Sequence, residues 1–121
     1  MKAVSDSDIL IDHLQGVPEA KIELRRYRSP HFSIISWMEL MCGAETDEER
    51  KAAETLFASM KKIDLSQTIA KIAVKERQNQ GLKLPDAVKL ASADSEGCIL
   101  LTQNTKYFDK EDPRVRIPYV L

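Results

Sequence analysis

The sequence predicts an α/β fold, with a central, mostly parallel sheet of four or five short strands between flanking helices in three layers. Short apolar segments, such as residues 32–36 and 98–101, alternate with longer stretches of helical periodicity. Strands separated by helices are typical of βαβ units. With 121 residues, of which 43% are hydrophobic, we expect one domain over residues 1–121 that needs no disulfide or structural metal.

The first half of the chain is predicted to begin with a strand that ends in an acidic turn. Val4 starts this strand, residues 5–8 (Ser-Asp-Ser-Asp) form the turn, and Gly16 ends the helix that follows. Pro18 suits the first turn of a second helix, because its fixed φ matches that position. The predicted elements are a strand from residue 4, helices over 9–14 and 18–28, a strand over 32–36 and a helix over 37–44.

The second half carries clear helix start and stop signals. Thr46 and Glu49 have the spacing of a capping box, Ser66 suits an N-cap, and Gly81 suits a helix end. The apolar segment after Gly97 is typical of a buried parallel strand. The predicted elements are helices over 47–60, 67–80 and 84–96, a strand over 98–101 and an edge strand over 116–120.

Composition excludes several classes of protein. Eighteen Lys and Arg against nineteen Asp and Glu give a net charge of -1, so any contact with nucleic acid must be local. The longest apolar stretches fall short of the roughly 20 residues of a membrane helix, and the N-terminus lacks a signal peptide's apolar region, so we expect a cytoplasmic protein. Cys42 and Cys98 are far apart without a CxxC motif, and we expect buried free thiols.

Polar side chains follow the predicted strands at one edge of the sheet. Asp6 and Asp8 follow the first strand, Glu39 comes one turn after the second, Asp86 opens the last long helix, and Asn104 follows the strand near residue 100. Ligands of open parallel sheets bind outside the carboxyl ends of the strands. We therefore expect these oxygen-bearing side chains to converge there.

Each acid also has a purely structural interpretation. Ser36 and Glu39 have capping-box spacing, Asp86 after Pro85 is a common helix cap, and Asp8 suits an N-cap. The presence of all these acids at one edge of the sheet, rather than any one of them, indicates a functional site. Three carboxylates about 5 Å apart would repel one another by roughly 10 kcal/mol at an effective dielectric near 20, so a cation must hold them. Oxygen ligands without His or Cys select Mg²⁺ or Mn²⁺, a chemistry suited to phosphodiester hydrolysis.

Four motifs, in order along the chain, resemble one known family. They are residues 6–12 (Asp-Ser-Asp-Ile-Leu-Ile-Asp), Ile-Ser at 35–36 with Glu-Leu at 39–40, residues 84–87 (Leu-Pro-Asp-Ala), and residues 100–104 (Leu-Leu-Thr-Gln-Asn) with Phe108. The sequence is similar to PIN-domain ribonucleases of the VapC toxin type. The resemblance implies a three-layer PIN-like fold, an acidic pocket for Mg²⁺ or Mn²⁺, endonucleolytic cleavage of RNA, a cognate antitoxin, and a homodimer.

The resemblance also assigns roles to residues. By motif, Asp6, Glu39 and Asp86 match the acidic metal ligands, and Asn104 stands at the fourth catalytic position, which is commonly acidic. Asp8 departs from the pattern in the opposite sense, because it stands where the family usually has Asn. The supporting residues that the motifs imply are Asp8, Ser36 and Thr102.

Two lysines near the motifs, Lys89 and Lys106, are candidates for holding RNA phosphates. Trp37 and Met38 lie on the helix that carries Glu39, and we expect part of that helix to face a second copy or an antitoxin. Two alternatives remain. One is a PIN-like domain that binds RNA or protein without catalysis, which Asn104 favours. The other is a receiver-type phosphoacceptor domain, which fits worse because Glu39 lies in a helix.

Overall fold

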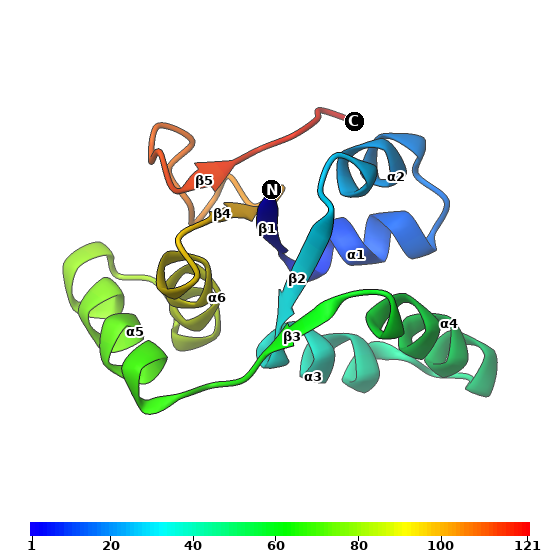
Figure 1. Ribbon diagram of the computed structural model, residues 1–121, viewed down its shortest axis with the longest axis horizontal. Coiled ribbons are helices and arrows are strands. Elements are labelled where there is room, and N and C mark those ends of the chain that lie inside the picture. Colours follow the sequence, from blue (N-terminus) through cyan, green and yellow to red (C-terminus); the bar gives the residue numbers. More distant parts are fainter.

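The computed structural model describes residues 1–121 and has a five-stranded parallel sheet with six helices (Figure 1). The sheet order is β3-β2-β1-β4-β5, and every neighbouring pair is parallel. This confirms the predicted α/β class. The strands are β1 (Lys2–Ser5), β2 (Ser29–Ser33), β3 (Lys61–Ile63), β4 (Ile99–Leu101) and β5 (Val115–Arg116).

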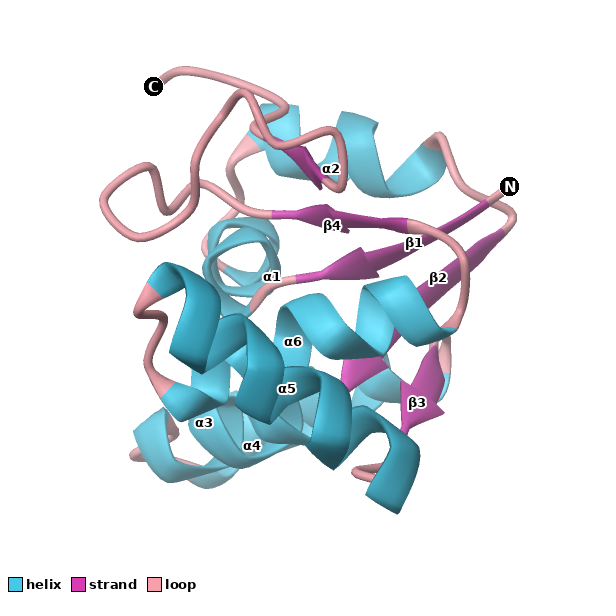
Figure 2. Cartoon of the chain, turned by 90° about the vertical axis from the view of Figure 1, so that its left-hand side faces the viewer, coloured by secondary structure: helices cyan, strands magenta, loops and turns pink.

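The helices lie on both sides of the sheet. In Figure 1, α5 and α6 lie on one side and α1 to α4 on the other, and Figure 2 shows α6 between the sheet and α5. None of the helices is both long and apolar enough to cross a membrane. The helices are α1 (Ser7–Leu14), α2 (Pro18–Arg25), α3 (Ile34–Gly43), α4 (Asp47–Ala58), α5 (Gln67–Gln80) and α6 (Leu84–Ser95).

The strand order creates one switch point in the sheet. From β1 the chain passes to β2 and β3 on one side, whereas β4 and β5 lie on the other. The connections therefore diverge at the carboxyl ends of β1 and β4, which is where open parallel sheets bind ligands. A hydrogen bond of 2.8 Å from the Asp6 amide to the Leu101 carbonyl joins these two ends.

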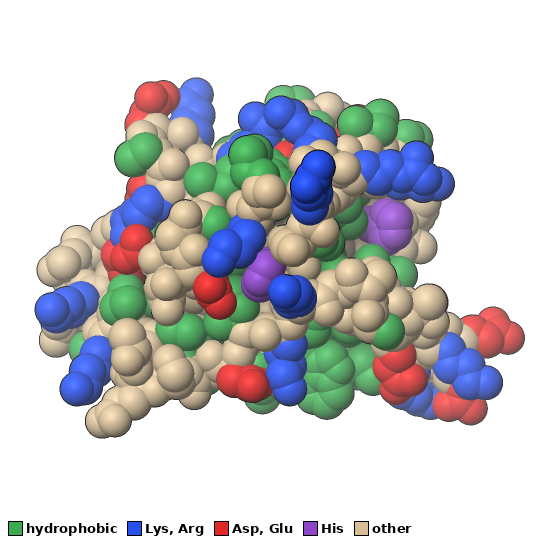
Figure 3. Space-filling model, viewed as in Figure 1, with side chains coloured by type: hydrophobic (Ala, Val, Ile, Leu, Met, Phe, Trp, Pro, Cys, Tyr) green, Lys and Arg blue, Asp and Glu red, His purple; other side chains and the backbone are tan.

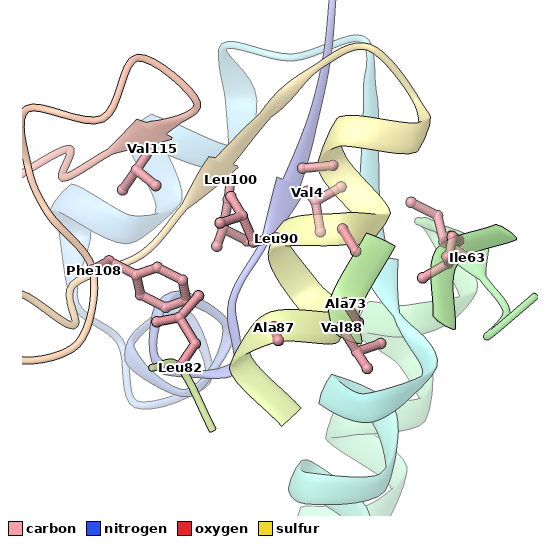
Figure 4. Packing of buried hydrophobic residues seen from close by; sticks show 13 residues of the cluster. Val4, Ile63, Ala73, Leu82, Ala87, Val88, Leu90, Leu100, Phe108 and Val115 are labelled. Carbon is pink, nitrogen blue, oxygen red and sulfur yellow. The ribbon is translucent and has the colours of Figure 1, made fainter. Parts of the chain in front are cut away.

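The largest part of the core lies between α6 and the sheet. Leu90 of α6 packs among the side chains of Val4 and Leu100, all fully buried (Figure 4). A second cluster on the other side of the sheet contains Phe32 and Phe57, whose ring centroids are 4.4 Å apart. These two clusters fix the sheet between α6 and α4 and so hold the carboxyl edge in place.

The second strand begins and ends three residues earlier than predicted. It spans Ser29–Ser33, and α3 starts at Ile34 because the Ser33 hydroxyl accepts a hydrogen bond from the Ile35 amide and caps the helix. The alternative interpretation of Ser36 and Glu39 as a capping box is therefore wrong, and both residues lie inside α3. The sequence interpretation mistook an apolar helix start for the end of a strand.

Two further expectations about strands need correction. The strand β3 was missed, because two of its three residues are exposed lysines and only Ile63 is buried. The predicted edge strand over 116–120 is limited to Val115–Arg116. Both are short strands at the edges of the sheet, where burial leaves little apolar signal.

The helix signals of the second half are confirmed. The Thr46 hydroxyl accepts from the Glu49 amide, and the Ser66 hydroxyl accepts from the Ile69 amide. Gly81 ends α5 in a left-handed conformation with a φ of 71°, which a residue with a Cβ rarely adopts. Both cysteines are free, as expected, but Cys42 is exposed at the end of α3 and Cys98 is half-buried, so the expectation of two buried thiols is wrong.

Candidate active site

Asp6 lies at the switch point and is almost completely buried. It is the N-cap of α1, and its Oδ1 accepts a hydrogen bond of 2.6 Å from the Ser7 amide. Its Oδ2 accepts one of 2.7 Å from the Thr102 hydroxyl, which follows β4. A carboxylate that leaves water needs such donors, so the ends of β1 and β4 together fix the position of Asp6.

The amino group of Lys89 lies at the centre of the site. Its Nζ is 2.7 Å from Asp6 Oδ1, 2.6 Å from Glu39 Oε1 and 3.9 Å from Asp86 Oδ1. The three carboxylates come from the end of β1, from α3 and from the first turn of α6, yet all reach this one nitrogen. The predicted convergence of Asp6, Glu39 and Asp86 is thus present, with a lysine among them.

The three carboxylates differ in exposure. The side chain of Asp6 is 5% exposed, that of Asp86 14% and that of Glu39 45%. Glu39 Oε1 also accepts a hydrogen bond of 2.8 Å from the Ser7 hydroxyl, which links α3 to the start of α1. The site is therefore closed at Asp6 and open to solvent at Glu39.

Asp8 lies beside this cluster on the β4 side. Its Oδ2 accepts hydrogen bonds of 3.0 Å from the Gln103 amide and 3.3 Å from the Thr102 hydroxyl. Its Oδ1 accepts a hydrogen bond of 2.7 Å from the Ile9 amide. Thr102 thus contacts both aspartates. The N-cap role that Asp8 could have filled belongs to Asp6.

Burial and mutual repulsion shift the ionisation of the acids. Burial, together with the charge of Asp6, raises the pKa of Asp8 to about 6. Burial also raises the pKa of Asp86, and the attraction of Lys89 opposes this increase. Burial alone would lower the pKa of Lys89, but Asp6 and Glu39 outweigh it and raise the pKa, so this amine stays charged.

Other predicted residues lie outside the contacts of the cluster. The Asn104 side-chain oxygen accepts from the Tyr107 amide and so caps a local turn. The Ser36 hydroxyl is buried in α3 without a partner, three residues before Glu39. Lys106 lies by the Tyr107 ring, with its Nζ 5.3 Å from the centroid. Lys89 was predicted on an RNA-facing surface, but at 3% exposure it is buried.

Sequence reasoning missed two features of the site. Ser7 contributes both its amide and its hydroxyl, to Asp6 and Glu39. The central position of Lys89 was also missed, although the sequence carried a signal for it. Lys89 falls in the stretch Ala-Val-Lys-Leu-Ala, where every neighbour is apolar, and a lysine on a buried helix face requires a partner for its charge.

Comparison with known proteins gives the family. The model of the PIN domain family matches residues 3–112, a range that contains every residue of the cluster. The chain belongs to the PIN-domain family. The resemblance predicted from the four motifs is confirmed, and the receiver-type alternative is set aside. No curated protein sequence matches this PIN-domain chain.

Solved structures agree with the family assignment. A chain of a toxin-antitoxin complex from Klebsiella pneumoniae is 38% identical, with a TM-score of 0.91 and coverage of 98% of this chain and 99% of that one. DNA-bound VapBC from Salmonella typhimurium is 20% identical, with a TM-score of 0.82 and 96% of each chain covered. FitAcB from Neisseria gonorrhoeae is 15% identical, with a TM-score of 0.81 and coverage of 98% and 99%. The last two share the PIN fold.

The donor set suits the divalent metal that PIN-domain nucleases usually use. Carboxylate oxygens from Asp6, Glu39 and Asp86 are hard ligands of the kind that Mg²⁺ and Mn²⁺ prefer. As they stand, however, no three acidic, His or Cys side chains form a ready-made ligand group. The Lys89 amino group already uses the Asp6 and Glu39 oxygens that face the centre. The residues fit a divalent cation, provided that Lys89 gives up these oxygens.

Proposed function

We propose that this protein is a Mg²⁺- or Mn²⁺-dependent endoribonuclease and the toxin component of a type II toxin–antitoxin pair. The observation that supports this most strongly is the meeting of Asp6, Glu39 and Asp86 around one point at the switch point of a PIN-domain sheet. Acids gathered at a ligand-binding edge at such electrostatic cost favour a catalytic role over a structural one.

In this proposal the cation would be held by Asp6, Glu39 and Asp86. When bound, it lowers the pKa of an attacking water and offsets charge on the scissile phosphate. Asp6, fixed by Thr102 and the Ser7 amide, supplies a carboxylate that needs no reorganisation. Glu39 is exposed enough to reach water at the open side of the site. Its position is maintained by the Ser7 hydroxyl.

RNA would approach from the side of Tyr107. Lys83 and Lys106 place their Nζ atoms 5.1 and 5.3 Å from the centroid of the Tyr107 ring, which is 39% exposed. An aromatic ring flanked by two cations is suited to stacking a base and contacting phosphates. Lys83 also lies three residues before Asp86, so this group borders the acids. The face of the molecule shown in Figure 3 carries mixed positive and negative side chains without a continuous basic surface.

A groove beside Glu39 fits the proposed antitoxin. It has a volume of about 520 Å³ between α1, α3 and α4, with an apolar floor that includes Leu14 and Leu40 and acids at Glu45 and Glu49. An amphipathic helix with basic residues complements this surface. Because Glu39 also lines the groove, an antitoxin helix seated there would reach the open side of the site. We place the pair in the cytoplasm, where RNA is available.

The experiment that tests the nuclease proposal is cleavage of a panel of structured RNAs by the purified protein with Mg²⁺ or Mn²⁺. We expect EDTA to abolish cleavage, and Asp6→Asn, Glu39→Gln and Asp86→Asn each to lower its rate by about 100-fold or more. Glu54→Gln, which changes an exposed carboxylate of α4, is the matched control. Cleavage that survives EDTA or all three substitutions contradicts the proposal.

Asn104 supports one second candidate, a PIN domain that binds RNA without cutting it. Its side chain is used by a local turn, so the fourth catalytic position contributes no carboxylate to the cluster. This candidate predicts RNA binding without turnover at any Mg²⁺ or Mn²⁺ concentration. The same RNA panel, read by gel shift as well as by cleavage, separates the two candidates.

A further inference from the structure

Lys89 is an unusual residue for the place that it occupies. It lies in the middle of α6, where residues 87–93 are all buried, and its side chain is 4% exposed. The helix packs there against α5 and the sheet, an environment that favours aliphatic side chains. Burying a cation costs free energy unless it is paired and hydrogen-bonded. Packing alone does not explain a lysine at residue 89, so the contacts of its amino group must.

Those contacts are the oxygens that the proposed cation needs. The Lys89 amino group is 2.7 Å from Asp6 Oδ1 and 2.6 Å from Glu39 Oε1. Asp6 Oδ2 accepts from the Thr102 hydroxyl, whereas Oδ1, which also accepts from the Ser7 amide, is the oxygen that faces the Lys89 amine. A divalent cation on these two oxygens would lie close to the Lys89 ammonium, and the two positive charges would repel each other.

We propose that Lys89 is an internal counter-ion of the acidic site, which a divalent cation must displace from Asp6 and Glu39 in order to bind. The inference rests on the proposed metal dependence. It adds that the Lys89 amine and the divalent cation compete for the same carboxylates. Without a divalent cation, the Lys89 amine holds the three carboxylates together and offsets their repulsion. With the cation, the amine leaves those two oxygens. Lys89 therefore raises the cation concentration at which the site fills.

Replacement of Lys89 by a neutral side chain of similar length separates this role from a structural one. For Lys89→Met we expect the Kd for Mn²⁺, measured by calorimetry, to fall by roughly tenfold or more, because the competing charge is gone. We expect the metal-free variant to melt at a lower temperature than the wild type and to gain more from Mn²⁺. Lys75→Met removes an exposed, unpaired lysine of α5 and should leave the Kd unchanged.

The outcomes of the calorimetry distinguish the two proposals. Equal Kd values for Lys89→Met and the wild type, or weaker binding by the variant, overturn the role of Lys89 and leave the nuclease proposal standing. If neither protein binds Mn²⁺ or Mg²⁺, the metal dependence fails together with the competition. If Lys89→Met binds the cation and the wild type does not, the result supports the proposal, because Lys89 then excludes the cation completely.

A second measurement is made on the wild type, and a variant serves only to assign the signal. A buried, paired lysine ammonium gives a ¹⁵N NMR signal that slow hydrogen exchange makes visible, and Lys89→Arg removes it for assignment. We expect saturating, diamagnetic Mg²⁺ to shift or abolish the Lys89 signal. A signal that is unchanged when Mg²⁺ saturates the protein means that the amine keeps its partners, and it overturns the proposal.

Discussion

Thr102 shows how one small side chain organises the site. Its hydroxyl donates to Asp6 Oδ2 at 2.7 Å and accepts from the Asn104 amide at 3.1 Å. It therefore connects the acid after β1 to the loop after β4. The residue is fully buried, so no water can replace either bond.

We predict that Thr102→Val, which keeps the shape and removes the hydroxyl, destabilises the protein by about 1–3 kcal/mol. The cost arises because Asp6 loses a donor and the Asn104 amide loses its acceptor. Urea unfolding measures the change. Thr55→Val removes an exposed hydroxyl of α4 that bonds only to the Lys51 carbonyl, and an equal loss in both variants would contradict the account.

Glu23 gives a pH-dependent prediction. Burial would raise its pKa, but hydrogen bonds from Arg116 and Tyr27 outweigh burial and hold the pKa below its ordinary value. A carboxyl with a lowered folded-state pKa adds stability above its unfolded-state pKa, and this stability disappears as the pH falls through the folded-state pKa. Glu23 should therefore stabilise the fold at pH 7 and lose this effect as the pH falls below the ordinary pKa of a glutamate and through its lowered folded-state pKa.

We expect Glu23→Gln to lose about 1.5–3 kcal/mol of stability at pH 7, the range for hydrogen bonds to a charged group. The difference from the wild type should shrink as the pH is lowered below the ordinary pKa of a glutamate. Urea unfolding at several pH values tests this, with Glu54→Gln as the exposed control. A difference that is constant with pH would show that the charge of Glu23 contributes nothing.

At the residue scale, the sequence identified the acids of the site but not the lysine that balances their negative charges. Asp6 was identifiable because it follows a strand, Asp86 because it follows Pro85 at a helix start, and Glu39 because it is a carboxylate within an apolar stretch. The roles of Lys89 and Asn104 were not, because they depend on side-chain direction. A lysine three residues after Asp86 can point to solvent or into the site, and only the packing of α6 decides which.

At the scale of elements, α6 positions the site. It brings Asp86 in its first turn and Lys89 one turn later to the carboxyl edge of the sheet. Its small buried residues, Ala87 and Ala91, leave room for close packing, and α5 covers its other side. The placement of two functional side chains therefore depends on how closely α6 approaches its neighbours.

We predict that Ala91→Leu costs about 1–3 kcal/mol, because a larger side chain in a filled core forces its neighbours apart. The same change should lower RNA cleavage by displacing Asp86 and Lys89. Ala58→Leu makes the identical substitution at an exposed position of α4 and should have little effect on either. A fully stable and active Ala91→Leu variant would show that α6 is not tightly packed.

The elements that sequence reasoning predicted well are those with capping or stop signals. Thr46, Ser66 and Gly81 marked the limits of α4 and α5 because the same polar and glycine chemistry operates in any helix. The start of α3 was misplaced because Ile34 and Ile35, with which the helix begins, are β-branched apolar residues typical of strands. The strand β3 was missed because its pairing with β2 depends on the backbone, and its lysines face solvent.

At the scale of the whole molecule, α3 exposes two large apolar side chains. Trp37 and Met38 on α3 are 40% and 51% exposed, and they lie side by side in sequence on the helix that carries Glu39. Adjacent exposed aromatic and Met side chains are enriched at interfaces. We propose that this surface forms the homodimer interface.

We expect the wild type to sediment as a dimer and Trp37→Glu to sediment as a monomer with an unchanged circular dichroism spectrum. The reason is that a buried, unpaired carboxylate is unfavourable in an interface. Ile22→Glu on α2, where the side chain is 65% exposed, serves as the control and should remain dimeric. A wild-type monomer, or a dimeric Trp37→Glu variant, would contradict the proposed surface.

We propose that the acids at the switch point form a site for a divalent cation. Anomalous diffraction from crystals of the wild type soaked in Mn²⁺ tests this most directly, because it locates the ion without reference to activity. We predict one strong anomalous peak bordered by Asp6, Glu39 and Asp86, absent from Asp6→Asn crystals treated in the same way. A peak elsewhere, or no peak at this edge of the sheet, would contradict the account.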